Sequence, residues 1–194
     1  MRKESVMSKL TVGSQFPDFK FNTGYKTGLT VKEEVKKAEK TVFWVLRYIG
    51  CTTCRYDVHL LSQRYAEFRA LGSQILVVMQ SEPATVQEDL KDSPLPFEII
   101  CDVDQEIYKT LEIRATETRE ERQPTSPEDI AKWQAKIAAV KASGFVHGKY
   151  EGNEQQLPAF FVTDNTGKVL YAHYAANSID MPTVDEALEI LKNL

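Results

Sequence analysis

Two cysteines separated by two residues, Cys51 and Cys54, have the most evident chemistry in this chain of 194 residues. Thiols at this spacing can close a disulfide across one turn, so one sulfur can attack a substrate and the other can resolve the mixed disulfide. We expect Cys51, nearer the start of the turn, to be the exposed nucleophile and Cys54 to be the resolving thiol. The spacing therefore predicts a redox-active dithiol.

The flanking residues place this pair between a buried strand and a helix. Val42–Leu46 is a continuous apolar run, which is typical of a strand covered on both faces, and Gly50 permits a sharp turn. From Val58 to Leu71 apolar residues recur every three or four positions, which predicts an amphipathic helix. The first turn of a helix carries unpaired N–H groups and partial positive charge. A thiolate there is stabilised, and its pKa falls below the free value of about 8.5.

A zinc half-site or two inert core thiols are the alternative interpretations of the pair. Structural zinc takes four ligands, usually supplied as two close pairs. The remaining candidates are Cys101, His59, His147 and His173, and they form no second close pair in the sequence. Redox function is the better interpretation. We expect Cys101 to be a small apolar residue at a strand end, and we assign the histidines no role.

Composition limits the other classes of function. The net charge is −4, with 42% hydrophobic and 27% charged residues, as in ordinary soluble globular domains. This balance argues against nucleic acid as a partner. No apolar run approaches the roughly 20 residues of a membrane-spanning helix, so we expect no membrane association. An odd number of cysteines and a charged N-terminus without a signal peptide favour the cytoplasm. No motif indicates a cofactor or a metal.

Strands and helices alternate along most of the chain. Further strands are predicted at Gln74–Met79 and Phe97–Cys101, with a helix from Pro83 to about Leu90 and another after Asp102. A charged helix is also predicted at Leu29–Lys40. This order predicts an α/β fold with a mostly parallel sheet, whose carboxyl-terminal edge holds the active site.

The later part of the chain departs from this rhythm. Residues 114–156 form an excursion that is rich in charge and carries a predicted helix at Pro127–Ser143. A hairpin over residues 159–174 and a final amphipathic helix follow. We therefore expect a flexible N-terminus at residues 1–11 and a single domain at residues 12–194, with an insertion at 114–156.

Three motifs together resemble the thioredoxin-like superfamily, specifically the AhpC/TSA (alkyl hydroperoxide reductase/thiol-specific antioxidant) family of peroxiredoxin-like proteins. They are Gly13-x-x-Phe16–Pro17–Asp18–Phe19, Gly50–Cys51–Thr52–Thr53–Cys54–Arg55, and Leu157–Pro158–Ala159–Phe160–Phe161–Val162-x-Asp164-x-x-Gly167. The resemblance covers most of residues 12–192 apart from the excursion. It implies a thioredoxin-like fold, in which a central mixed sheet is flanked by helices, with a helical insertion before the C-terminal hairpin.

The resemblance also implies roles for residues outside the cysteine pair. In this fold the proline before the hairpin is typically cis and stands beside the redox cysteines. It thus predicts a cis Leu157–Pro158 bond, with a Leu157 backbone that orients an extended substrate. Arg55, directly after Cys54, either stabilises a thiolate or is a solvated surface residue.

Departures from the family pattern separate the candidate activities. Peroxiredoxins usually place a threonine or serine three residues before the peroxide-attacking cysteine, and a proline four residues before that. For Cys54 those positions hold Cys51 and Arg47. The arginine that peroxiredoxins carry at the start of the late strand corresponds to Pro158. Thioredoxin's buried carboxylate corresponds to Val45, which leaves Arg47, Arg55 or water to handle protons.

These residues favour an enzyme that performs thiol–disulfide exchange on a disulfide substrate through a Cys51/Cys54 couple. An external thiol reductant of the thioredoxin or glutathione type would regenerate the couple. The alternative is antioxidant peroxide reduction, with Cys54 peroxidatic and Cys51 resolving. A third hypothesis is a non-catalytic redox-sensing or binding module that uses the excursion as its contact surface. A homodimer is left open.

Overall fold

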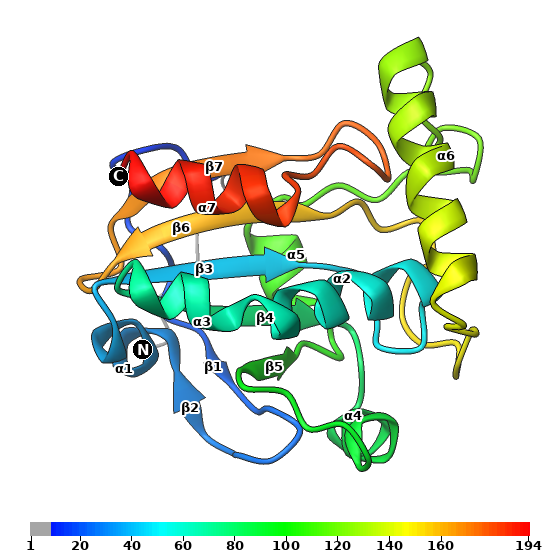
Figure 1. Ribbon diagram of the computed structural model, residues 1–194. Coiled ribbons are helices and arrows are strands. Elements are labelled where there is room, and N and C mark those ends of the chain that lie inside the picture. Colours follow the sequence, from blue (N-terminus) through cyan, green and yellow to red (C-terminus); the bar gives the residue numbers. More distant parts are fainter. Residues whose placement is uncertain (1–8) are drawn as a thin grey trace.

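The strand that precedes the two cysteines lies at the centre of the fold. In the computed structural model, which describes residues 9–194, β3 (Lys40–Val45) lies between β4 (Ser73–Met79) and β6 (Ala159–Asp164). The five-stranded sheet has the order β5-β4-β3-β6-β7, with β5 (Glu98–Cys101) and β7 (Val169–Tyr174) at its edges (Figure 1). β3 runs parallel to β4 and antiparallel to β6, so the sheet is mixed, as the thioredoxin-like fold implies.

Helices cover both faces of this sheet because the side chains of β3 alternate between two apolar clusters. Val42 and Trp44 pack with α2, α3, α4 and α7, whereas Phe43 and Val45 pack with α1 and α5. The helices are α1 (Val31–Glu34), α2 (Thr52–Gln63), α3 (Tyr65–Ala70), α4 (Pro83–Leu90), α5 (Glu106–Thr110), α6 (Pro127–Ala142) and α7 (Val184–Lys192). The short elements are β1 (Lys20–Phe21), β2 (Leu29–Thr30) and the 3-10 turn η1 (Val35–Lys37).

Some predicted elements differ in the structure. The helix predicted at Leu29–Lys40 is instead β2, one turn of α1 and η1, since this stretch has few apolar positions to hold a longer helix against the sheet. The helix predicted from Val58 begins earlier, at Thr52, because Cys51 caps it, and it is interrupted at Arg64. The strands, the hairpin and the helix of the excursion are confirmed.

The predicted flexible N-terminus falls mostly outside the described residues. Within them, Leu10 does not fit the prediction of flexibility: it is buried, and its N–H donates to the Tyr174 hydroxyl at 2.6 Å.

The longest helix, α6, belongs to the excursion and lies against α2 at one end of the sheet (Figure 1). In residues 9–194 no helix combines the length and the apolar character needed to cross a membrane.

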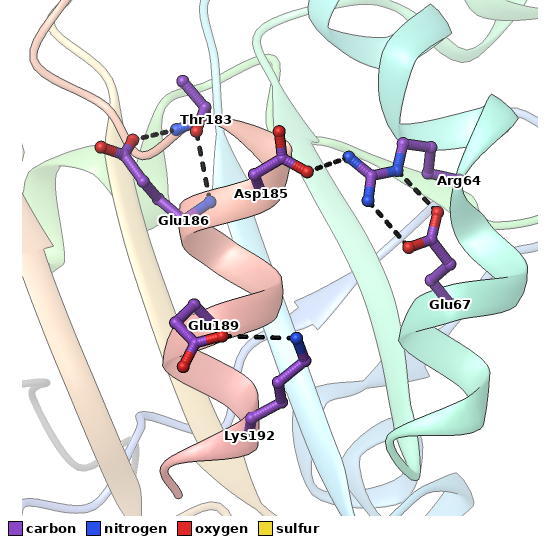
Figure 2. A network of polar contacts seen from close by, with 7 residues as sticks. All are labelled: Arg64, Glu67, Thr183, Asp185, Glu186, Glu189 and Lys192. Carbon is purple, nitrogen blue, oxygen red and sulfur yellow. Dashed lines mark hydrogen bonds and ion pairs between the residues drawn. The ribbon is translucent and has the colours of Figure 1, made fainter.

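A surface network of polar groups connects α7 with the junction of α2 and α3 (Figure 2). Arg64 donates to both carboxylate oxygens of Glu67, at 2.6 and 2.7 Å, and forms an ion pair with Asp185. Thr183 and Glu186 cap the start of α7 reciprocally. Exposed ion pairs are screened by water and contribute little, so the apolar face of α7 is what holds it to the core.

Tyr108 of α5 supports the sheet at the end nearest the cysteines. Its side chain is buried. Its hydroxyl donates to Leu46 O at 2.6 Å and also lies 3.1 Å from Val78 O.

We expect Tyr108→Phe to lower the free energy of unfolding by about 1–2 kcal/mol, because the buried Leu46 carbonyl loses a donor. Chemical denaturation measures this loss. Tyr25→Phe, at an exposed position, is the matched control, and equal stability of the two variants would contradict the expectation.

Candidate active site

Cys51 occupies the capping position of α2. Its backbone is extended (φ −70°, ψ 120°), and its Sγ accepts a hydrogen bond from Cys54 N at 3.4 Å. Thr53 Oγ1 lies 3.3 Å from the same sulfur. The sulfur therefore sits among the free N–H groups of the first turn, where a negative charge is stabilised. The predicted position of the pair between a buried strand and a helix is confirmed.

Arg47 makes the shortest polar contact with this sulfur. Its Nη2 donates to Cys51 Sγ at 2.8 Å, and its Nη1 donates to Glu154 O at 2.8 Å. Burial alone would lower the pKa of Arg47, but the charges that Cys54 and Cys51 can carry raise it above its usual value. Arg47 is therefore a permanent cation that bridges the dithiol and the excursion.

The two sulfurs differ in their protonation. The pKa of Cys51 is well below its usual value, because the Cys54 side chain, Arg47 and Thr53 stabilise the thiolate against the opposing effect of burial. Burial raises the pKa of Cys54 well above its usual value, and the adjacent Cys51 raises it further. Cys51 is therefore the thiol of the pair that ionises first, and Cys54 is the one that keeps its proton.

Both sulfurs are covered, so the predicted exposure of Cys51 is wrong. Cys51 is 1% exposed and Cys54 is 4% exposed. Residues 146–154 of the excursion, here called the strap, lie against the turn that leads into Cys51. Gly148 N donates to Gly50 O at 2.8 Å, and a Cβ on Gly50 would clash with Lys149 O. The strap thus rests directly on the turn before Cys51, which only a glycine allows.

Arg55 holds the strap, whereas Arg47 is the arginine that donates to the thiolate. The Arg55 Nη1 donates to Val146 O at 2.9 Å and its Nε donates to Ile49 O at 3.1 Å. It also forms an ion pair with Asp89. Burial lowers the pKa of Arg55 and the charge of Cys51 acts in the opposite direction, so Arg55 also lies within the electrostatic range of the thiolate.

A second anchor of the strap is a polar cluster around Tyr48. The buried Tyr48 hydroxyl donates to Glu154 Oε1 at 2.6 Å and lies 3.2 Å from His147 Nε2. The His147 ring stacks on Tyr150 with centroids 4.0 Å apart. No sequence signal pointed to this cluster, because Tyr48 and Glu154 are 106 residues apart and neither belongs to a recognisable motif.

Arg122, also in the excursion, is a second cation near the dithiol that sequence reasoning missed. Burial lowers the pKa of Arg122, and the nearby Arg47 lowers it further, while Cys51 acts in the opposite direction. Its Nε is buried without a hydrogen-bond partner in residues 9–194. The single thiolate therefore lies near two guanidinium groups.

The predicted cis bond before Pro158 is wrong. No peptide bond in the described part of the chain is cis. Leu157 N donates to Arg114 O at 3.1 Å, and Leu157 O accepts from Gln156 Nε2 at 3.2 Å. Contacts with the excursion therefore use both backbone groups of Leu157. The Leu157–Pro158 bond before β6 is trans, which is the isomer that X–Pro bonds favour. In this state neither group is free to pair with a substrate.

The remaining sequence candidates lie apart from this chemistry. Burial raises the pKa of Cys101 to about 12, so it is a neutral thiol. His173 contacts Asp180, and His59 packs against Phe145. In residues 9–194 no three His, Cys, Asp or Glu side chains come together as metal ligands.

Residues 12–172 match the AhpC/TSA family. The chain belongs to the AhpC/TSA family. The resemblance inferred from the three motifs is thereby confirmed, and with it the expectation of an oxidoreductase. A search of curated protein sequences finds no match.

Solved structures share the fold at low sequence identity. Peroxidoxin BcpB from Mycobacterium tuberculosis superposes with a TM-score of 0.66 at 12% identity, over 94% of this chain and 97% of that one. A cysteine-to-serine mutant of peroxiredoxin 6 from Arenicola marina gives 0.69 at 14% identity, over 94% and 72%. The thiol peroxidase from Chromobacterium violaceum gives 0.62 at 14% identity, over 97% and 90%. The predicted thioredoxin-like fold is confirmed.

Replacing Arg47 tests the origin of the low Cys51 pKa. In Arg47→Leu the thiolate loses its closest cation, so the Cys51 pKa should rise towards the free value of about 8.5. A titration of thiolate ultraviolet absorbance should then move to higher pH, with less thiolate near pH 7. Arg114→Leu, which removes an exposed arginine, should titrate like the parent protein. An unmoved Arg47→Leu titration would exclude Arg47 as the stabilising group.

Replacing Gly50 tests whether the strap covers the nucleophile. Gly50→Ala places a methyl group against the Lys149 backbone, so the strap must move away. We expect Cys51 to react with iodoacetamide roughly tenfold faster at constant pH. In Gly24→Ala the added Cβ meets the Val86 side chain instead, and the rate should not change. Equal rates in the two variants would show that the strap does not limit access.

Proposed function

We propose that this protein is a dithiol oxidoreductase that performs thiol–disulfide exchange with Cys51 as its nucleophile. The Cys51 thiolate attacks one sulfur of a substrate disulfide, forms a mixed disulfide and releases the other substrate sulfur as a thiolate. Cys54 then loses its proton and attacks Cys51 Sγ. The Cys51–Cys54 bond forms, the second substrate sulfur leaves as a thiolate, and the substrate is reduced by two electrons.

The observation that carries this proposal is the opposite displacement of the two pKa values. A nucleophile must be a thiolate, and Cys51 has the capping position of α2 and the Arg47 contact that keep it ionised. A resolving thiol must stay inactive until the mixed disulfide has formed. Cys54 meets that need, because its burial and the adjacent thiolate hold it neutral until the charge on Cys51 is gone.

Peroxide reduction is the second candidate, and the similar structures favour it, since they include a peroxidoxin, a peroxiredoxin and a thiol peroxidase. For that activity we propose to exchange the roles that the sequence predicted for the two cysteines, which were Cys54 as the peroxidatic and Cys51 as the resolving thiol. The pKa values support Cys51 as the group that attacks the peroxide and becomes a sulfenic acid. Cys54 would then displace water from it and close the same disulfide.

Reaction with either substrate oxidises the enzyme to its Cys51–Cys54 disulfide. Both catalytic cycles therefore need an external thiol to reduce this disulfide. We propose a reductant of the thioredoxin or glutathione type, whose thiolate opens the Cys51–Cys54 bond by the same exchange chemistry. Burial of both sulfurs supports a requirement for movement of the strap during this step, because an attacking thiol must reach a disulfide sulfur directly.

Trapping with single cysteine variants tests the proposal. In Cys54→Ser, oxidised glutathione should form a stable mixed disulfide on Cys51, because no resolving thiol remains, and intact-mass spectrometry with peptide mapping measures the adduct. In Cys51→Ser, Cys54 should stay unmodified, since its pKa is raised. A glutathione adduct on Cys54 and none on Cys51 would reverse the assigned roles.

Hydrogen peroxide separates the two candidate substrates in the same Cys54→Ser protein. Under the leading proposal Cys51 forms a sulfenic acid only at the rate of an ordinary thiolate. A rate many orders higher would replace disulfide exchange by peroxide reduction as the function. Cys101→Ser is the matched control, because its neutral thiol should affect neither reaction.

A further inference from the structure

Arg122, in the first part of the excursion, is a partly buried cation without a counter-ion. Its carbonyl accepts from Ser178 N at 2.9 Å, which holds its backbone in place. Its Nε is enclosed and has no hydrogen-bond partner in residues 9–194. Its terminal nitrogens, Nη1 and Nη2, are not enclosed in this way, and no group in the same part of the chain accepts from them. A ligand can therefore reach both terminal nitrogens, although not Nε.

The acidic side chains of residues 9–194 leave this cation unneutralised. The ion pairs of this part of the chain all join other residues. The neighbouring carboxylate of Glu121 accepts instead from Glu117 N at 3.1 Å. A partly buried charge without a partner is costly. An anion from outside the chain that contacts the terminal nitrogens of Arg122 would therefore be stabilised.

Backbone pairing brings the start of the excursion next to the contacts of Arg47. Thr116 N donates to Gln155 O at 3.0 Å. The adjacent Glu154 O accepts from Arg47 Nη1 at 2.8 Å, and Arg47 Nη2 donates to Cys51 Sγ at 2.8 Å. The part of the excursion that carries the unpaired cation thus lies near the dithiol.

Positive charge is in excess on this side of the dithiol. Burial lowers the pKa of Arg122, and Arg47 and Arg119 lower it further, while the two cysteines act in the opposite direction. A Cys51 thiolate balances only one of these cations, and its charge disappears when the mixed disulfide forms. A negative group on the substrate would supply the balance that the chain itself does not.

We propose that Arg122 binds a carboxylate of the substrate, so that the exchange reaction prefers small disulfides with a carboxylate within a few bonds of the sulfur. The inference rests on the proposed thiol–disulfide exchange and names its substrate class. The planar guanidinium suits the two oxygens of a carboxylate. By holding the carboxylate, Arg122 keeps the bound half of the substrate in place while Cys54 attacks Cys51 Sγ. No bond to Arg122 forms or breaks.

Three disulfides with the same C–C–S–S–C–C skeleton test this preference in the reduced full-length protein. Dithiodiglycolate carries two carboxylates, bis(2-hydroxyethyl) disulfide is uncharged, and cystamine carries two ammonium groups. Mass spectrometry after alkylation gives the rate of Cys51–Cys54 oxidation, which is divided by the rate of free 2-mercaptoethanol with the same disulfide. At low salt the dicarboxylate should react about tenfold faster than the uncharged disulfide, and cystamine should react more slowly than either.

Single substitutions assign the preference to Arg122. In Arg122→Gln the dicarboxylate and the uncharged disulfide should react within about twofold of each other. A change in thiolate content would alter the rates with all three disulfides alike, so the ratio of rates reports recognition of the substrate charge. Lys141→Gln removes an exposed cation of the same excursion and should keep the parent ratio. Arg122→Lys should keep part of it, because the charge remains without the planar fork.

Adipate, the carbon analogue of dithiodiglycolate, tests carboxylate binding without any exchange reaction. It should slow the alkylation of Cys51 by iodoacetamide saturably, whereas uncharged 1,6-hexanediol should not. In Arg122→Gln this protection should be lost, and in Lys141→Gln it should persist.

The outcomes distinguish the carboxylate site from the exchange reaction. Reaction with none of the three disulfides would reject thiol–disulfide exchange, whereas adipate protection that depends on Arg122 would still support the site. Exchange with the same ratio of rates in the parent protein and in Arg122→Gln would overturn the site and leave the exchange reaction in place. Adipate that gives no protection, or equal protection in both proteins, would also overturn it.

Discussion

The pairing of the Cys51 thiolate with the Arg47 guanidinium is the interaction on which the site depends. Either charge would be costly to bury alone, whereas together they compensate each other. The arrangement needs three parts of the chain at once. The end of β3 leads to Arg47, the start of α2 holds the sulfur, and the strap supplies the Glu154 carbonyl that takes the second arm of Arg47.

The excursion therefore contributes to the candidate active site. The five-stranded sheet and α2 provide the dithiol, as the family fold implies. The excursion provides Glu154 beside Arg47, His147 beside Tyr48 and Arg122 as a second cation. The contacts at the site that sequence reasoning missed therefore involve residues 114–156.

Local patterns predicted most of the fold, because the residue pattern that indicates a strand or a helix lies within the element itself. The apolar run before Gly50, the CxxC spacing and the Asp164–Gly167 turn are all of this kind. The dithiol was found for the same reason. Its environment was not, since the contacts of Arg47 and Tyr48 with Glu154 join residues more than a hundred positions apart. Contacts between residues so far apart produce no periodic pattern in the sequence from which they could be predicted.

The two wrong expectations at the site have the same physical origin. Cys51 was expected to be exposed because it opens a turn, and Leu157–Pro158 was expected to be cis because of the family resemblance. In both places the excursion changes the outcome, by covering the turn with the strap and by bonding Arg114 and Gln156 to the Leu157 backbone. A segment without a recognised motif could not be placed against the sheet from the sequence alone.

The order of the strands has a consequence for synthesis of the protein. Domains fold as the chain emerges from its N-terminal end, yet β3 lies between β4 and a strand that begins only at Ala159. Until that strand is made, one apolar edge of β3 is open to pairing with other chains. Residues 146–154 are made just before that strand, so the strap cannot lie over the turn before Cys51 until most of the chain has been synthesised. Cover for an early pair of cysteines therefore depends on a segment that is made almost a hundred residues later.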